Sequence, residues 1–160
     1  MEEYEYSFKV KNIKPYVDYA IKNGFKLIGS NKEIRDLYTG DGTILARITT
    51  REDNIVLDFK SGDDTGKILH VRKESLPLSI KKKDLDTIKS IIDVLGYKQI
   101  KHLVRERVVY EKGNVRFEID DYKEPEVMKV VAIEGLKEEV DKVYELLKEI
   151  NDKEQLHEKL

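Results

Sequence analysis

Residues 3–10 read EYEYSFKV and alternate between polar or charged side chains and aromatic or aliphatic ones. This period of two predicts a β-strand, because successive side chains of a strand point to opposite faces of its sheet. One face of the strand is therefore apolar, and the other carries the charged side chains of Glu3, Glu5 and Lys9. This charged face requires an explanation, because the same feature recurs along the chain.

Seven further segments are predicted to be strands. They cover residues 34–39, 43–51, 55–60, 67–75, 102–110, 115–121 and 127–134. The polar faces of these strands also carry charged residues, often at positions i and i+2: Arg47, Asp58, Lys60, Arg72, Glu74, Arg105, Arg107, Arg116, Glu118, Asp120 and Glu134. Turn-forming residues separate several of these segments, so we expect most neighbouring strands to pair antiparallel.

Three amphipathic helices are predicted between and after the strands. The first follows Asn12 and ends at Gly24, the second spans residues 85–95, and the third spans residues 136–150. In each helix the apolar residues recur at intervals of three and four, as one buried face requires. We therefore expect residues 1–150 to form a single α+β domain and residues 151–160 to form a polar helix end or tail.

The composition limits the classes of function. The chain has 160 residues, with 30 Lys and Arg against 32 Asp and Glu, and a formal net charge of −2. This balance excludes a basic protein that coats nucleic acid. The sequence contains no cysteine, which excludes disulfides, a thiolate nucleophile and Cys-ligated zinc. Short apolar runs and an acidic first decapeptide predict a cytoplasmic protein with neither a nucleic-acid nor a membrane partner.

The charged strand faces have two interpretations. They are either the solvated outer surface of a sheet, or the lining of a tunnel formed by a sheet that curls on itself. The predominance of Arg over Lys favours the tunnel, because a guanidinium presents a planar set of donors to phosphate or carboxylate oxygens. A tunnel lining must also balance its charges, since an uncompensated buried ion is costly. The seven cations and seven carboxylates on these faces satisfy that condition without requiring a tunnel.

The segment from Glu3 to Lys9 resembles the opening strand of the CYTH superfamily, the triphosphate tunnel metalloenzymes, whose signature is Glu-x-Glu-x-Lys. The short helix and Gly24 that follow are similar to the class IV adenylyl cyclase branch. Further landmarks of that family are matched in order by Asp36-Leu37-Tyr38, Ala46-Arg47-Ile48, Leu57–Gly62, Arg72-Lys73-Glu74, Leu95-Gly96-Tyr97, Arg105-Glu106-Arg107, Ile119-Asp120 and Ile133-Glu134-Gly135. The resemblance covers residues 3 to about 135.

The resemblance implies a closed or nearly closed antiparallel eight-stranded β-barrel, a tunnel with helices packed outside. It implies that Mg²⁺ or Mn²⁺ is held by carboxylates, namely Glu3, Glu5, Asp120, Glu134 and Glu74. It implies phosphate contacts from a set of basic residues, namely Lys9, Arg47, Lys60, Arg72, Arg105, Arg107 and Arg116. The substrate would be ATP, thiamine triphosphate or inorganic triphosphate, either cyclised to cyclic AMP or hydrolysed. A homodimer is the default expectation for a protein of this kind.

Three positions depart from the family pattern. Ser7 stands where the signature has Lys, Thr49 replaces the second Arg of an Arg-x-Arg strand, and Ala132 replaces the first Glu of a closing Glu-x-Glu. Loss of one transition-state charge donor typically costs about 10²–10³ in rate. The sequence therefore leaves three hypotheses open. The first is a metal-dependent enzyme acting on a triphosphate, and the second is a module of the same fold that binds a phosphorylated ligand without efficient turnover. The third is an antiparallel α+β protein with a solvent-facing charged sheet and no small-molecule site.

Overall fold

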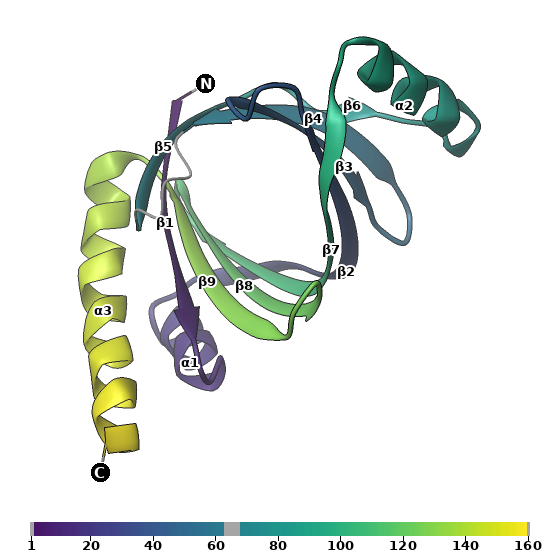
Figure 1. Ribbon diagram of the computed structural model, residues 1–160. Coiled ribbons are helices and arrows are strands. Elements are labelled where there is room, and N and C mark those ends of the chain that lie inside the picture. Colours follow the sequence, from purple (N-terminus) through teal and green to yellow (C-terminus); the bar gives the residue numbers. More distant parts are fainter. Residues whose placement is uncertain (1, 63–67, 160) are drawn as a thin grey trace.

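Eight strands of the protein form a closed antiparallel ring (Figure 1). The computed structural model describes residues 2–62 and 68–159. The ring strands are β1 (Glu2–Val10), β2 (Lys26–Thr39), β3 (Ile44–Thr50), β4 (Ile55–Gly62), β5 (Leu69–Glu74), β7 (Lys98–Lys112), β8 (Val115–Glu124) and β9 (Met128–Gly135). They pair in the order β3-β2-β7-β8-β9-β1-β5-β4, and β4 pairs with β3 to close the ring. The predicted closed antiparallel arrangement of eight strands is confirmed.

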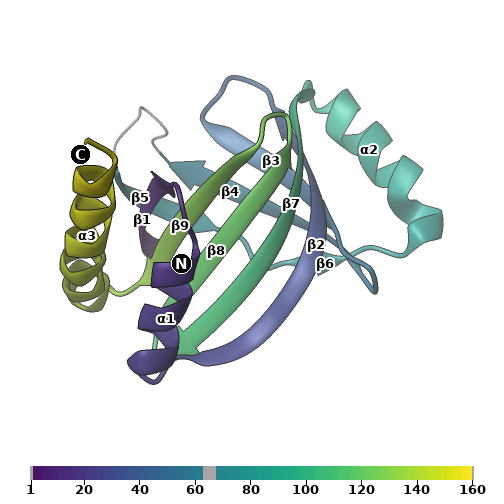
Figure 2. The ribbon, with the colours of Figure 1, turned by 90° about the horizontal axis from the view of Figure 1, so that it is seen from below.

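The remaining elements lie outside this ring. The two-residue strand β6 (Leu78–Ser79) pairs with β4. The helices are α1 (Lys14–Lys22), the short 3-10 helix η1 (Lys82–Asp84), α2 (Leu85–Val94) and α3 (Lys137–Lys159). Figure 2 shows β2, β7, β8 and β9 side by side as one curved wall, with α1 crossing its outer side. No helix in the described ranges is long and apolar enough to cross a membrane.

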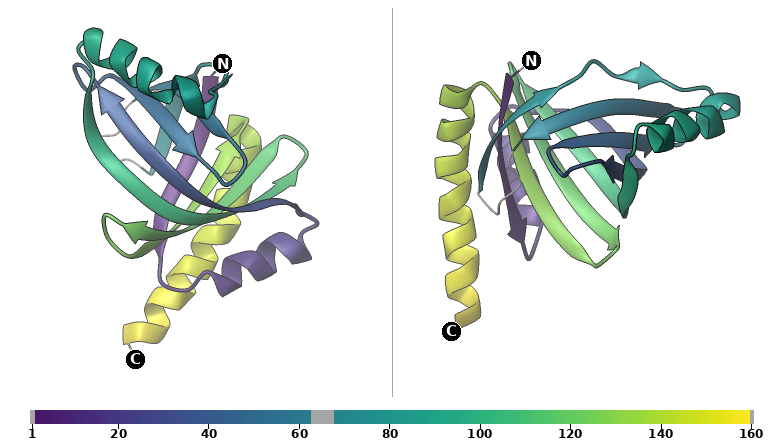
Figure 3. Two further views of the ribbon diagram at one scale, coloured as in Figure 1. Left: turned by 90° about the vertical axis from the view of Figure 1, so that its right-hand side faces the viewer. Right: turned by 45° about the horizontal axis from the view of Figure 1, so that its top comes forward.

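The apolar faces of the strands point outward and are covered by the helices. On one side α1 and α3 pack on β1, β8 and β9, with Tyr16, Phe117, Ile133, Val140 and Leu147 fully buried. Tyr6 stacks on Tyr144 of α3 with ring centroids 4.0 Å apart, and its hydroxyl donates to Asp141 at 2.6 Å. The aromatic face of residues 3–10 is therefore the outer face of β1. Figure 3 shows α3 running beside this strand.

A second apolar core lies under α2. Ile92 of this helix and Ile80 pack on buried residues of β2, β3 and β4, namely Tyr38, Ala46, Ile48 and Leu57. Because both cores are outside the ring, they cannot fill its interior. The interior is therefore left to the opposite, charged faces of the same strands.

The structure lengthens two of the predicted strands. β2 begins at Lys26, eight residues before the predicted start, and β7 begins at Lys98. Gly29, Ser30 and Asn31 favour a loop locally, but their segment pairs with β7 through a register shift between Leu27 and Gly29. The strand predicted at 67–75 corresponds to β5, which begins at Leu69. The sequence also predicts a polar loop at residues 61–66, but residues 61 and 62 end β4. The rest of that loop, and residue 67 of the predicted strand, lie outside the described residues.

Candidate active site

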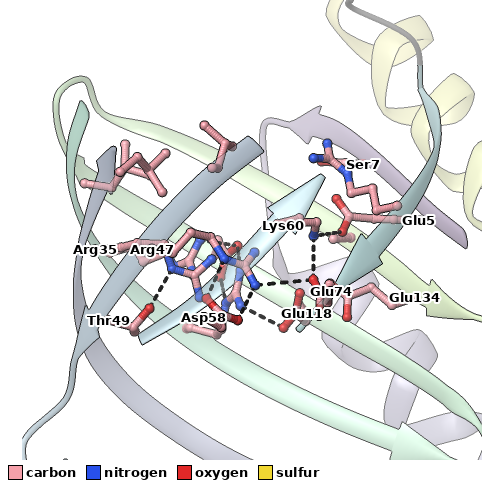
Figure 4. A pocket seen from close by; sticks show the side chains of 18 of the residues that line it. Glu5, Ser7, Arg35, Arg47, Thr49, Asp58, Lys60, Glu74, Glu118 and Glu134 are labelled. Carbon is pink, nitrogen blue, oxygen red and sulfur yellow. Dashed lines mark hydrogen bonds and ion pairs between the residues drawn. The ribbon is translucent and has the colours of Figure 1, made fainter. Parts of the chain in front are cut away.

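The lumen of the ring contains a cavity of about 560 Å³, a volume typical of small-molecule sites. Its lining is predominantly charged (Figure 4). Eleven of the twelve site residues predicted from the sequence line it: Glu3, Glu5, Glu74, Asp120, Glu134, Arg47, Lys60, Arg72, Arg105, Arg107 and Arg116. The interpretation of the charged faces as a solvated outer surface is therefore wrong. The side chains of Arg105 and Asp120 are each only 3% exposed.

Lys9 is the predicted residue that the structure does not bring into the cavity. Lys9 is exposed to solvent, although its side chain is on the same face of β1 as those of Glu3 and Glu5. Among the described strands, β1 pairs with β5 only as far as Tyr6, so β9 alone borders it at Lys9. At this end an ammonium group reaches water, where it is better solvated than in the lumen.

Three carboxylates gather on one wall, which we call the carboxylate cluster: Glu3, Glu5 and Glu134. One oxygen from each lies within 4.8 Å of the other two. The sheet produces this grouping, because Glu5 of β1 lies directly opposite Glu134 of β9 and Glu3 is two residues away on the same face. The Oε1 atom of Glu3 is buried and has no hydrogen-bond partner in the described part of the chain.

The carboxylate cluster is electrostatically strained when no cation is bound. Burial raises the pKa of Glu3 to about 7, and repulsion from Glu74 and Glu5 adds to this, against an opposing effect of Lys60. Burial and the neighbouring Glu118 raise the pKa of Glu134 well above its ordinary range. Groups that ionise reluctantly at neutral pH, packed around a buried oxygen that lacks a donor, are stabilised either by a proton or by a cation.

The carboxylate cluster fits a hard divalent cation by its chemistry. Mg²⁺ and Mn²⁺ prefer carboxylate oxygens, and three acidic ligands suit such a site. The two other predicted metal ligands, Asp120 and Glu74, are paired with basic side chains of the lumen. Asp120 accepts two hydrogen bonds from Arg107, and Glu74 pairs with Lys60 at 2.9 Å and with Arg47 at 3.3 Å.

Lys60 forms ion pairs both with the carboxylate cluster and with Glu74 next to it. Its ammonium lies 3.3 Å from Glu5, 4.0 Å from Glu3 and 2.9 Å from Glu74. Since three carboxylates share one ammonium, Lys60 compensates only part of their charge. Lys60 therefore offsets only part of the effect of burial and of the acidic neighbours on the pKa of Glu3.

The opposite side of the lumen carries four arginines from β2, β3 and β7, which we call the arginine wall: Arg35, Arg47, Arg105 and Arg107. Most of them are held by carboxylates. Arg47 Nε donates to Asp58 at 2.8 Å, and Arg107 donates to Asp120 at 2.7 and 2.8 Å and to Glu118 at 2.7 Å. Ion pairs of this kind hold guanidinium groups in fixed orientations.

Comparison with known proteins identifies the fold. No protein-family model and no curated protein matches the sequence. The structure of a conserved hypothetical protein from Pyrococcus furiosus superposes with a TM-score of 0.72 at 20% identity, over 91% of this chain and 88% of that one. A "putative adenylyl cyclase" from Hippeastrum, described as having a dominant triphosphatase activity, gives 0.68 at 12% identity, over 96% and 88%. The chain has the CYTH fold.

The CYTH fold by itself does not determine the activity. A chain of the Schizosaccharomyces pombe Mediator head module superposes with a TM-score of 0.67 at 9% identity, over 92% of this chain and 95% of that one. One fold commonly supports unrelated functions. The function must therefore be argued from the side chains in the lumen.

Sequence analysis missed three charged residues of this CYTH fold. Glu33 is 2% exposed and pairs with Arg105 at 2.8 Å and Arg51 at 2.6 Å, while Arg35 lines the cavity. Arg107 and Arg105, followed by Arg35 and Arg51, lower the pKa of Glu33 to about 2 against the effect of burial. The sequence did not predict Glu33 as a site residue because residues 26–33 were not predicted to be a strand. Its i, i+2 spacing from Arg35 is the signal that could have revealed it.

The raised pKa of Glu3 predicts how stability depends on pH. The folded protein holds this proton more tightly than the unfolded chain, whose Glu titrates near 4.5. The contribution of Glu3 is therefore complete below pH about 4.5 and is lost as the pH rises through about 7. We expect the melting temperature measured in EDTA to fall across this interval, and Mg²⁺ to reduce the fall by stabilising the ionised form. A melting temperature in EDTA that rises instead would contradict the assignment.

Proposed function

We propose that the protein is a metal-dependent enzyme that hydrolyses a triphosphorylated small molecule in the lumen. The observation that carries this proposal is the placement of the carboxylate cluster opposite the arginine wall, across one cavity of about 560 Å³. A triphosphate with divalent cations has the complementary arrangement, because its metals require carboxylates and its phosphate oxygens require guanidinium groups.

The charge balance of the lumen supports a ligand that brings both signs of charge. Among the described residues at or bordering the cavity, eight cationic side chains face eight carboxylates: Arg35, Arg47, Arg51, Lys60, Arg72, Arg105, Arg107 and Arg116, against Glu3, Glu5, Glu33, Asp58, Glu74, Glu118, Asp120 and Glu134. An anion alone or a metal alone would disturb this balance. A triphosphate that enters with two divalent cations leaves it nearly unchanged.

The residues have separable tasks in such a reaction. Glu3, Glu5 and Glu134 would hold the divalent cation, which draws negative charge from phosphate oxygens and so facilitates attack at phosphorus. Arg47 and Arg105 are oriented by their ion pairs before any ligand arrives. Because these donors are already oriented, little free energy is spent on reorienting them when negative charge develops on the leaving phosphate.

Hydrolysis is preferred to cyclisation as the primary proposal. The structural neighbour from Hippeastrum is described by its dominant triphosphatase activity, although it is named as a cyclase. Hydrolysis also demands less of the site, because water is the nucleophile and no ribose hydroxyl has to be positioned. If the protein instead cyclises ATP, cyclic AMP will be detected among the products of the assay described next.

Metal-dependent phosphate release tests the proposal. Inorganic triphosphate, ATP and thiamine triphosphate are each incubated with Mg²⁺ or Mn²⁺, and phosphate, ADP and cyclic AMP are quantified separately. We expect release that requires the metal and disappears in the double variant Glu3→Ala, Glu5→Ala. The exposed, outward-facing Glu106 provides the matched control Glu106→Gln, which should retain the activity. Release no greater than that of the double variant would exclude the enzyme.

A second candidate function is binding without efficient turnover. Ser7 and Ala132 lie directly opposite each other on β1 and β9, and both line the cavity beside the carboxylate cluster. At both positions a short side chain replaces the charged residue that the family resemblance implies. Calorimetric binding of triphosphate with no phosphate release would support this candidate over the enzyme.

A further inference from the structure

Arg35 differs from the other members of the arginine wall in its partners. Within the described part of the chain, no carboxylate lies within ion-pairing distance of its guanidinium, whereas Arg47, Arg105 and Arg107 each have at least one carboxylate partner. Among the same described residues, Arg35 donates one hydrogen bond to a side chain, from Nε to Thr49 Oγ1 at 3.0 Å. Arg35 is half-buried and lines the cavity.

The surroundings of Arg35 are cationic. Burial lowers the pKa of Arg35, and Arg105, Arg107 and Arg47 lower it further, with Glu33 opposing. A guanidinium nevertheless keeps its proton at neutral pH because its ordinary pKa is so high. The protein therefore maintains a positive charge that has no direct ion pair with a carboxylate of the described residues. Such a charge, directed into a cavity large enough for a ligand, attracts an anion from solution.

Arg35 lies beside Thr49, the position at which β3 lacks a basic side chain. Arg35 of β2 and Thr49 of β3 are direct cross-strand partners, and both side chains face the lumen. Opposite residues in an antiparallel pair have Cβ atoms about 4.5–5.5 Å apart, so a long side chain at either position reaches the same space. Thr49 is too short to reach across the lumen, and its hydroxyl instead accepts a hydrogen bond that orients Arg35.

We propose that Arg35 binds a phosphate group of the substrate, supplying from β2 the guanidinium that β3 lacks at Thr49. This assignment rests on the function proposed above and identifies a binding residue of the same site. Figure 4 shows Arg35, Arg47 and Thr49 on the opposite side of the pocket from Glu5 and Glu134. The phosphate group that Arg35 contacts is therefore one that lies away from the carboxylate cluster.

Calorimetry with inorganic triphosphate, in EDTA and in Mg²⁺, tests the assignment. Arg35→Gln should weaken binding about tenfold or more, because a hydrogen bond to a charged group is lost. Lys32→Gln is the matched control, since it removes one positive charge from the exposed face of the same strand and should bind as the wild type does. The double variant Arg35→Gln, Thr49→Arg should recover most of the lost affinity, which a purely structural role of Arg35 does not predict.

Thermal melting of the ligand-free variants completes the test. Arg35→Gln should melt at the wild-type temperature or above it, because Arg35 is repelled by its neighbours. A clear decrease would make Arg35 structural and overturn the assignment. Wild-type affinity in Arg35→Gln, or failure of Thr49→Arg to restore binding, would also overturn it while leaving the proposed function intact. If the wild-type protein binds no triphosphate with or without Mg²⁺, the proposed function and the assignment both fail.

Discussion

Glu3→Gln is expected to reduce metal-dependent triphosphate hydrolysis by about 10²–10³-fold and, at pH 8, to raise the melting temperature of the metal-free protein. The two effects have one cause. We assign Glu3 to the metal site. Burial and repulsion by the acidic neighbours both oppose the ionisation of its carboxyl, as its raised pKa indicates. A neutral amide of the same shape removes that repulsion, but it is a poorer ligand for Mg²⁺.

The opposite signs of these effects separate a functional role from a structural one. A residue that merely holds the fold together would lower stability and activity together. Glu106→Gln, on the outer face of β7, serves again as the control for the loss of one carboxylate. Activity is measured by phosphate release at saturating Mg²⁺, and stability by thermal melting in EDTA. Unchanged turnover in Glu3→Gln would remove Glu3 from the metal site.

Arg107→Gln is expected to have the largest effect on folding, a decrease in melting temperature of about 10 °C or more. Arg107 donates to Asp120 and Glu118 on β8, and these carboxylates are only 3% and 4% exposed. Their attraction raises the pKa of Arg107 against the effect of burial. Gln removes the closest cation from both buried carboxylates, which keep only a longer contact of Asp120 with Arg105 at 3.7 Å and one of Glu118 with the more exposed Arg116 at 3.1 Å. Breaking a buried pair in this way costs about 3–5 kcal/mol.

Two comparisons make this result specific. Lys123→Gln removes an ion pair with Asp121 on the same strand, β8, but Lys123 is 47% exposed, so we expect almost no change. The double variant Arg107→Gln, Glu118→Gln should be more stable than Arg107→Gln alone, because one of the two carboxylates that lost the Arg107 guanidinium is then neutral. A melting temperature of Arg107→Gln close to that of Lys123→Gln would show that water compensates the lumen charges.

The resemblance to a known family supplied what the residues alone left open. The i, i+2 spacing of charges placed Arg105 with Arg107, and Glu118 with Asp120, on shared faces, and the structure confirms this placement. The same spacing was equally compatible with a solvated sheet. Whether these faces point inward depends on which side the helices cover, and a strand's own residues do not specify that.

Local sequence determined the alternation of the strands, the three amphipathic helices and the charge balance of one set of faces. These properties depend on neighbours along the chain, which a sequence displays directly. Closure of the ring, the grouping of Glu134 with Glu3 and Glu5, and the position of Arg35 beside Thr49 were decided by tertiary structure. They depend on strand register between segments far apart in the chain, and a shift of one residue would move every side chain to the other face.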